Sequence, residues 1–188
     1  MRGRLKRVTA PTVEPVTVDW IKQHTHISHD VEDTLLESWI KSGRELAEDF
    51  HGYSYLTQVY ELTFDCFPEC TFELPRSPVQ SVAWIRYYDS YNNEWTFSPA
   101  NYVVDLDNCP ARIALAFGVS WPGTTLRPIN GVKIRYTAGF GSSASAVPEK
   151  VKDAIALYCA HRNENRAGEE KIPESFYNLL RSDRRIPC

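Results

Sequence analysis

Hydrophobic positions follow a helical period in the first third of the chain. Between residues 31 and 50 they recur at intervals of three and four, which predicts an amphipathic helix of about five turns with one apolar face. Ser28 and Asp30 are placed to cap its start, and Gly52 is placed to end it. The apolar positions are Val31, Leu35, Leu36, Trp39, Ile40, Leu46, Ala47 and Phe50.

Two further helices are predicted on either side of the middle of the chain. Thr17 can cap a short helix over residues 18–22, and Pro148 suits the first turn of a helix near the C-terminus. Each buried apolar side chain contributes roughly 1.5–3 kcal/mol, so apolar faces of this kind are expected to pack together. The predicted bundle core contains Val31, Leu35, Leu36, Trp39, Ile40, Leu46 and Phe50 from the first region and Val151, Ile155 and Tyr158 from the last.

In the middle of the chain, hydrophobic and polar positions alternate with a period of two. Six β-branched or aromatic segments are separated by turn residues, and Asp89–Asn93 has the composition of a hairpin turn. No helical pattern lies between these segments, which favours antiparallel pairing over parallel crossovers. The predicted strands cover residues 57–64, 82–88, 94–97, 102–105, 111–115 and 132–136.

These patterns predict an α+β fold in which N- and C-terminal helices form a bundle around an inserted antiparallel β subdomain. The expected organisation within the 188 residues is a basic extended arm over 1–16, N-terminal helices over 17–54, the β insertion over 55–138, and C-terminal helices and tail over 139–188. Residues 17–188 would then be one structural domain with an insertion.

Charge is distributed unevenly along the chain. The formal net charge is −3, but the first ten residues carry +4 and the last ten +2, which leaves −9 on the remainder. A basic end can bind nucleic acid or an acidic protein surface, or be a solvated end. The acidic remainder disfavours sequence-specific DNA binding, because phosphate contacts require clustered Lys and Arg.

No apolar run reaches the roughly 18 residues of a membrane span, and the N-terminus lacks the apolar stretch of a secretory signal, so no membrane contact and cytoplasmic synthesis are expected. Five cysteines with no CxxC pair indicate neither a disulfide framework nor a four-cysteine zinc site. Reduced thiols that mostly serve packing are the expectation.

Two clusters have the composition of ligand sites. Gly139 and Gly141 lie between a strand and a helix, but the third glycine and the lysine of a phosphate-binding loop are absent, which favours a turn with positive φ. His24, His26 and His29 are spaced closely enough for a metal, but no carboxylate or cysteine completes the set, which favours surface histidines.

Other candidates for chemistry also have simpler interpretations. His161 and Glu164 share a helix face and could act as an acid–base pair, but a surface hydrogen bond is the default. Cys66 and Cys70 suit an edge turn. No nucleophile motif is present, so neither enzymatic activity nor a cofactor is expected. An alternative function is a carbohydrate- or single-stranded nucleic-acid-binding module, with bases or sugars stacked on Trp84, Tyr87, Tyr88, Tyr91, Trp95 and Trp121.

The order of several short phrases carries a family resemblance over about residues 17–166. The phrases are S-H-D-V-E-D-T-L-L-E-S-W-I, L-P-R-S-P-V-Q-S-V, Y-V-V-D, P-A-R-I-A-L, V-K-I-R-Y-T-A-G-F-G, V-P-E-K-V-K-D-A-I and A-H-R-N-E-N-R. In this order and spacing the chain resembles the head–tail connector, or adaptor, proteins of tailed bacteriophages and prophages.

The resemblance implies a structural protein of the head–tail junction. Proteins of this family form a ring, typically of twelve copies. The ring would bind the portal protein and the next stopper or tail-completion protein, and genomic DNA would pass through its lumen without sequence-specific contact. The C-terminal segment would reach the portal. Its matching residues here are Ile172, Pro173, Phe176, Tyr177, Leu180, Arg181, Arg184 and Arg185.

Overall fold

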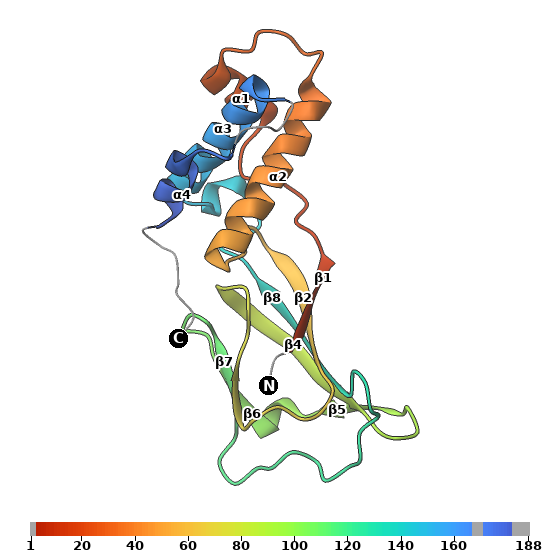
Figure 1. Ribbon diagram of the computed structural model, residues 1–188. Helices are drawn as coiled ribbons and strands as arrows, with labels where there is room; N and C mark the ends of the chain where they lie inside the picture. The colour runs from red at the N-terminus through yellow and green to blue at the C-terminus, as the bar shows by residue number, and fades with distance from the viewer. Residues whose placement is uncertain (1–2, 167–170, 182–188) are drawn as a thin grey trace. The chain divides into compact units, whose positions relative to one another are not determined.

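The computed structural model describes residues 3–166 and 171–181 (Figure 1). The chain divides into two compact units. The β unit comprises residues 1–10 and 57–139, and the helical unit comprises residues 11–56 and 140–188. The predicted α+β class, with helices from both ends of the chain and an antiparallel β portion between them, is confirmed.

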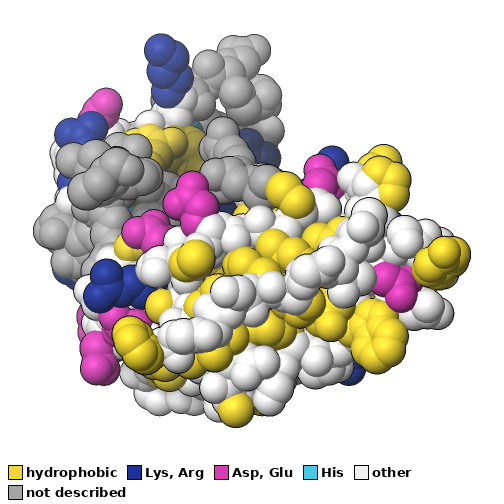
Figure 2. All heavy atoms as spheres, turned by 90° about the horizontal axis from the view of Figure 1, so that it is seen from below, with side chains coloured by type: hydrophobic (Ala, Val, Ile, Leu, Met, Phe, Trp, Pro, Cys, Tyr) yellow, Lys and Arg dark blue, Asp and Glu magenta, His cyan; other side chains and the backbone are white. Residues whose placement is uncertain are grey.

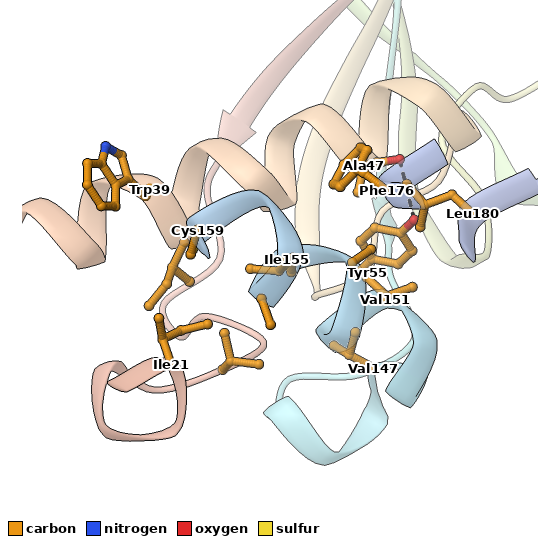
Figure 3. Close-up of a cluster of buried hydrophobic side chains, with 14 of the residues drawn as sticks. Ile21, Trp39, Ala47, Tyr55, Val147, Val151, Ile155, Cys159, Phe176 and Leu180 are labelled. Atoms are coloured by element: carbon orange, nitrogen blue, oxygen red, sulfur yellow. Dashed lines mark hydrogen bonds between the residues drawn. The ribbon is translucent and has the colours of Figure 1, made fainter. Parts of the chain in front are cut away.

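The helical unit is a bundle around one apolar core. Its α-helices are α1 (Val18–Thr25), α2 (Asp33–His51), α3 (Glu149–Glu164) and α4 (Glu174–Arg181), and a 3-10 turn covers Ala144–Ala146. Figure 3 shows that the core receives side chains from all four α-helices. Of the predicted core residues, the structure buries Leu36, Trp39, Ile40, Val151 and Ile155, with Leu46, Phe50 and Tyr158 partly buried against them.

Two predicted helix caps are confirmed. The Thr17 hydroxyl accepts a hydrogen bond from the backbone N–H of Trp20 at 3.2 Å, at the start of α1. Gly52 ends α2 with φ +73° and donates its N–H to the carbonyl of Glu48 at 2.9 Å. Glycine is favoured at this position because its backbone enters the left-handed region.

The predicted start of α2 is wrong, and two predicted core residues change with it. Asp30 does not cap the helix, because its carboxylate binds Lys22 of α1 at 2.6 Å, and α2 begins only at Asp33. Val31 therefore precedes the helix and is 90% exposed. Leu35 lies in the first turn of α2, at the edge of the apolar face that buries Leu36, and its side chain is 38% exposed. Neither belongs to the core.

Helices α2 and α3 approach closely at a glycine. Gly43 is buried on α2, and a Cβ placed on it would lie 3.0 Å from Cδ1 of Tyr158 and 3.5 Å from Cγ2 of Ile155. The absence of a side chain at residue 43 thus sets the distance between the two helices.

A larger side chain at Gly43 is expected to force α2 and α3 apart. Gly43→Leu should lower the free energy of unfolding by about 1–3 kcal/mol, the usual cost of overpacking. Ser42→Leu, at the adjacent exposed position on the same helix, is the control and should change stability little. Urea unfolding followed by circular dichroism measures both; equal stability of the two variants would contradict this close packing.

The β unit contains two antiparallel sheets. The five-stranded sheet has the order β1 (Arg4–Thr9), β2 (Gln58–Phe64), β8 (Val132–Ala138), β4 (Val79–Tyr88) and β5 (Glu94–Phe97). The three-stranded sheet has the order β3 (Thr71–Glu73), β7 (Arg112–Leu115) and β6 (Tyr102–Asp105), and a 3-10 turn over Pro99–Asn101 precedes β6. As predicted, β4 and β5 form a hairpin, in which the Asp89 carboxylate accepts the N–H groups of Tyr91 and Asn93.

Alternation along the strands places one face of the large sheet in an apolar core shared with the small sheet. In β8 every second residue, Val132, Ile134, Tyr136 and Ala138, is fully buried. Ile113 of β7 and Tyr102 of β6 belong to the same buried cluster. The opposite face of the large sheet is polar.

Part of the basic segment predicted as an extended arm is a strand of the large sheet. Residues Arg4–Thr9 form β1, which pairs antiparallel with β2 at the edge of the large sheet. The following stretch joins the helical unit, where Pro15 and Val16 are buried. A strand of this composition suits an edge, because charged side chains there oppose further strand pairing. In the part of the chain that is described, no helix is long and apolar enough to cross a bilayer.

Candidate interaction surfaces

The predicted portal-docking segment is divided between core and surface. Phe176 and Leu180 are fully buried in the helical unit, which contradicts their assignment as docking contacts (Figure 3). Ile172 and Tyr177 are partly buried against the same core. The physical reason is that α4 is amphipathic and its apolar face is used by its own chain.

The remaining face of α4 is polar and exposed. It presents Glu174, Ser175, Asn178 and Arg181, and the Arg181 guanidinium donates to Asn178 at 3.0 Å and to Glu174 at 3.2 Å. Pro173 lies half-buried just before the helix. The predicted docking residues Arg184 and Arg185 lie outside the described residues. A partner that binds α4 as it is folded here would meet this polar face.

The glycine-bearing loop after β8 connects the two units. Gly139 has φ +140°, as expected of a turn glycine, and donates its N–H to the carbonyl of Pro78 at 2.8 Å. The N–H of Phe140 donates to the carbonyl of Tyr55. A Cβ on Gly141 would lie 2.7 Å from that of Ala146. These backbone donors are used within the chain, which agrees with a turn rather than a phosphate cradle.

The three N-terminal histidines do not converge. His24 stacks on Trp20 with ring centroids 3.8 Å apart, His26 is the left-handed residue that ends α1, and His29 is exposed. Across residues 3–166 and 171–181, no group of three or more His, Cys, Asp or Glu side chains is arranged to hold a metal ion. Nδ1 of His161 lies 3.2 Å from the amide nitrogen of Asn165, a local contact at the end of its helix.

Only part of the cysteine prediction is correct. Cys159 is buried in the helical core, and burial raises the pKa of its thiol to about 12, which leaves it protonated. Cys66 and Cys70, for which a packing or an edge-turn role was predicted, are exposed in the connection between β2 and β3, which fits the edge turn and not packing. The carbonyl of Cys70 accepts the N–H of Leu115, which ties this connection to β7.

The six aromatic residues of the predicted stacking platform are dispersed. Trp121 stacks inside the β unit on Phe67, with centroids 5.1 Å apart and planes 14° from parallel, and Tyr87 also packs inward. Trp84 and Tyr88 lie on the opposite face of the large sheet, under guanidinium groups. Tyr91 and Trp95 are exposed at the hairpin. The proposed platform is therefore not assembled.

The polar face of the five-stranded sheet carries a cluster of positive charge that sequence analysis missed. Its strand register places basic residues from three strands on one side, and we call this the basic sheet face. Two acidic residues, Glu61 and Glu94, share it, which leaves a formal charge of +3 on its strand residues. Alternation along β4 and β8 was the available signal. The five basic residues are Arg4, Lys6, Arg86, Lys133 and Arg135.

Glu61 organises the centre of the basic sheet face. Its carboxylate lies 2.8 Å from Nη2 of Arg135 and 3.1 Å from Nζ of Lys133. Burial alone would raise the pKa of Glu61, but hydrogen bonds from Arg135 and Lys133 outweigh burial and lower it. Glu61 therefore stays ionised and holds both cations in place.

Two guanidinium groups of the basic sheet face lie close to the Trp84 ring. The Arg86 guanidinium is 4.3 Å and the Arg135 guanidinium 4.7 Å from the indole ring. Arg86 also pairs with Glu94 at 2.8 Å, across the hairpin. Cation–π contacts of this kind orient the arginine side chains before any partner arrives.

One end of the β unit exposes apolar side chains. The hairpin between β4 and β5 contributes Tyr91, 85% exposed, and Trp95, 52% exposed. Phe117 and Ile129, from the connection between β7 and β8, are exposed as well. Figure 2 looks onto this end and shows hydrophobic side chains in yellow between white polar and backbone atoms. Exposed apolar groups in such number are typical of interaction surfaces.

Comparisons with known proteins place the fold. No protein-family model matches the chain, and no curated protein matches it. Among solved structures it is similar to a chain from the neck of an empty gene transfer agent (GTA) particle computed with C6 symmetry, with TM-score 0.82 and 25% identity over 98% of this chain and 97% of that chain.

Two further solved structures are similar to this chain over almost the same length. A chain from the neck of the native GTA particle computed with C12 symmetry has TM-score 0.77 and 26% identity over 98% of this chain and 97% of that chain. A chain from the virion of the native GTA particle has TM-score 0.80 and 24% identity over 98% and 96%. Over nearly its whole length, the protein therefore has the fold of chains in the neck of a gene transfer agent particle.

Proposed function

We propose that this protein is a structural component of the neck of a phage-like particle, where copies of it form a ring. The observation that carries this proposal is the match with GTA neck chains, which covers both units and almost all of each compared chain. Shared fold alone does not imply shared function. Here, however, the compared chains come from particle necks computed with C6 and C12 symmetry, and such rotational symmetry relates the copies of a ring.

Within such a neck the protein would dock under the portal and offer another surface to the next neck or tail component. The exposed face of α4 and the residues after it are the proposed portal contact. The residues buried in α4 would act indirectly, by holding that face in place. The exposed apolar end of the β unit is a separate surface within the same chain.

DNA would pass through the lumen of the ring without being bound tightly. Twelve copies, each with a formal charge of −3, would have a total charge of about −36. Such a negative charge repels the DNA phosphates and opposes their nonspecific binding. The role is mechanical and needs no catalytic step.

Assembly of the purified protein tests this function directly. Mass photometry and negative-stain imaging should show closed rings, formed by the protein alone or on addition of the portal protein of its particle. A protein that stays monomeric under both conditions, and does not bind the portal protein in a pull-down, would contradict the proposal.

A further inference from the structure

We propose that the basic sheet face of one copy binds the acidic outer face of α2 on the next copy. This inference rests on the proposed ring and identifies the two surfaces that would close it. A contact between two different surfaces of the same chain is heterologous, and repetition of such a contact around an axis produces a ring.

The two units carry opposite formal charge. The helical unit contains 16 Asp and Glu against 11 Lys and Arg, for a net charge of −5. The β unit contains 8 acidic and 10 basic residues, for a net charge of +2. A chain divided in this way is complementary to further copies of itself, and electrostatic complementarity favours one docking orientation over others.

One face of α2 carries a line of acidic side chains. Glu37, Lys41 and Asp49 are exposed on the outer side of α2, and Glu45 lies half-buried between them, for a net charge of −2. The Glu45 carboxylate also lies 3.8 Å from Nη2 of the buried Arg44. The spacing of four residues keeps the four side chains in line. We call these four residues the acidic α2 face.

The dimensions of the two surfaces agree. From Glu37 to Asp49 the helix rises about 18 Å at 1.5 Å per residue. From β1 to β4 the sheet spans three strand spacings, about 14 Å. A helix laid across the strands would therefore bring Glu37 and Asp49 near opposite sides of the cluster formed by Lys6, Lys133 and Arg86.

The chemistry of the basic sheet face favours a protein partner over nucleic acid. Its excess charge is three, whereas proteins that bind DNA through phosphates commonly make about 6–10 such contacts. The cations Arg86 and Arg135 lie close to the Trp84 ring, which hinders base stacking there. Arginine and tryptophan held in a fixed arrangement are the side chains enriched at the energetic centres of protein interfaces.

Complementary charge reversal tests the pairing of these two faces. The sheet variant is Arg4→Glu with Lys6→Glu, at exposed positions of the edge strand β1. The helix variant is Glu37→Lys with Asp49→Lys, at exposed positions of α2. Asp153→Lys with Glu164→Lys on α3 is the control for the helix variant, because it changes the net charge by the same amount and sign at exposed positions elsewhere.

Each test variant alone should need a protein concentration more than about tenfold higher to assemble, since like charges then face each other. An equimolar mixture of the two should assemble again, because alternating copies restore opposite charges at every contact. The control should assemble as the wild type does. Native mass spectrometry distinguishes alternating from random composition, and thermal unfolding by circular dichroism confirms that all variants are folded.

The outcomes separate this inference from the proposed function. The pairing of these faces is wrong if the wild type forms rings and the single test variants assemble as well as it does, or if their mixture fails to assemble. In either case the proposed ring is unaffected. A wild-type protein that shows no self-association would overturn both. If the sheet variant loses binding to a DNA duplex but still assembles, the basic sheet face is a nucleic-acid site and the inference is wrong.

Discussion

Replacing Arg44 by alanine is expected to lower the free energy of unfolding of the helical unit by about 3–5 kcal/mol, the usual cost of leaving a buried charge without its partner. Arg44 is only 1% exposed. Its Nε lies 2.7 Å from Glu14, and its Nη1 lies 2.8 Å from Glu48. Glu48 is itself buried and also accepts the backbone N–H of Tyr55 at 3.0 Å.

The effect should extend beyond one ion pair. Glu14 belongs to the segment that leads into α1, and Tyr55 belongs to the segment that leaves α2, so Arg44 connects three stretches of chain. Burial alone would lower the pKa of Arg44, but Glu14 and Glu48 raise it above its ordinary value, so the guanidinium stays charged. Loss of this side chain would leave two carboxylates without their shared cation.

Chemical denaturation of Arg44→Ala and Lys41→Ala measures this effect. Lys41 lies on the same helix but is exposed, and its removal should change stability by less than about 0.5 kcal/mol. Arg44→Lys should be intermediate, because an ammonium group cannot reproduce the forked hydrogen bonds of a guanidinium. Equal stability of Arg44→Ala and Lys41→Ala would show that the buried ion cluster does not stabilise the unit.

The second large effect is expected at Phe176. Its truncation to alanine should cost about 3–5 kcal/mol, as for other buried phenylalanines. Phe176 is fully buried and packs near Tyr158 of α3, with ring centroids 6.1 Å apart. On the same side of α4, the carbonyl of Leu180 makes a short hydrogen bond with Nε2 of His51. Loss of Phe176 should therefore release α4 from the bundle.

A matched pair of variants separates a core role from a docking role. Phe176→Ala should lower the unfolding midpoint, whereas Asn178→Ala with Arg181→Ala, at exposed positions on α4, should leave it unchanged and weaken capture of portal protein in a pull-down. Phe176→Ala with wild-type stability and lost portal capture would restore Phe176 as a docking residue and contradict its place in the core.

Much of the fold was predictable because it depends on local periodicity. The six predicted strands all exist, and the α1 cap and the α2 terminus lie where Thr17 and Gly52 indicated. The short strand β3 and the basic strand β1 were missed. Neither has a distinctive alternation of its own, and each is a strand because a partner offers backbone hydrogen bonds, β7 and β2 respectively.

The candidate surfaces were less predictable than the fold. Hydrophobic residues at helical spacing identify an apolar face but not what covers it. Val31 and Leu35 were therefore assigned to a core that does not reach them, and Phe176 and Leu180 to a partner although their own chain buries them. The basic sheet face is assembled from strands more than 120 residues apart in sequence, through the register of β1, β2, β8 and β4.

By itself, the sequence determined the α+β class, the position of the antiparallel portion between helices, and the ends of several elements, because these follow from side-chain period and from backbone preferences of single residues. Tertiary structure alone decided which apolar faces are buried within one copy and which charges meet on one surface. Burial and electrostatic potential depend on distances between residues remote in sequence, and those distances exist only after the strands have paired and the helices have packed.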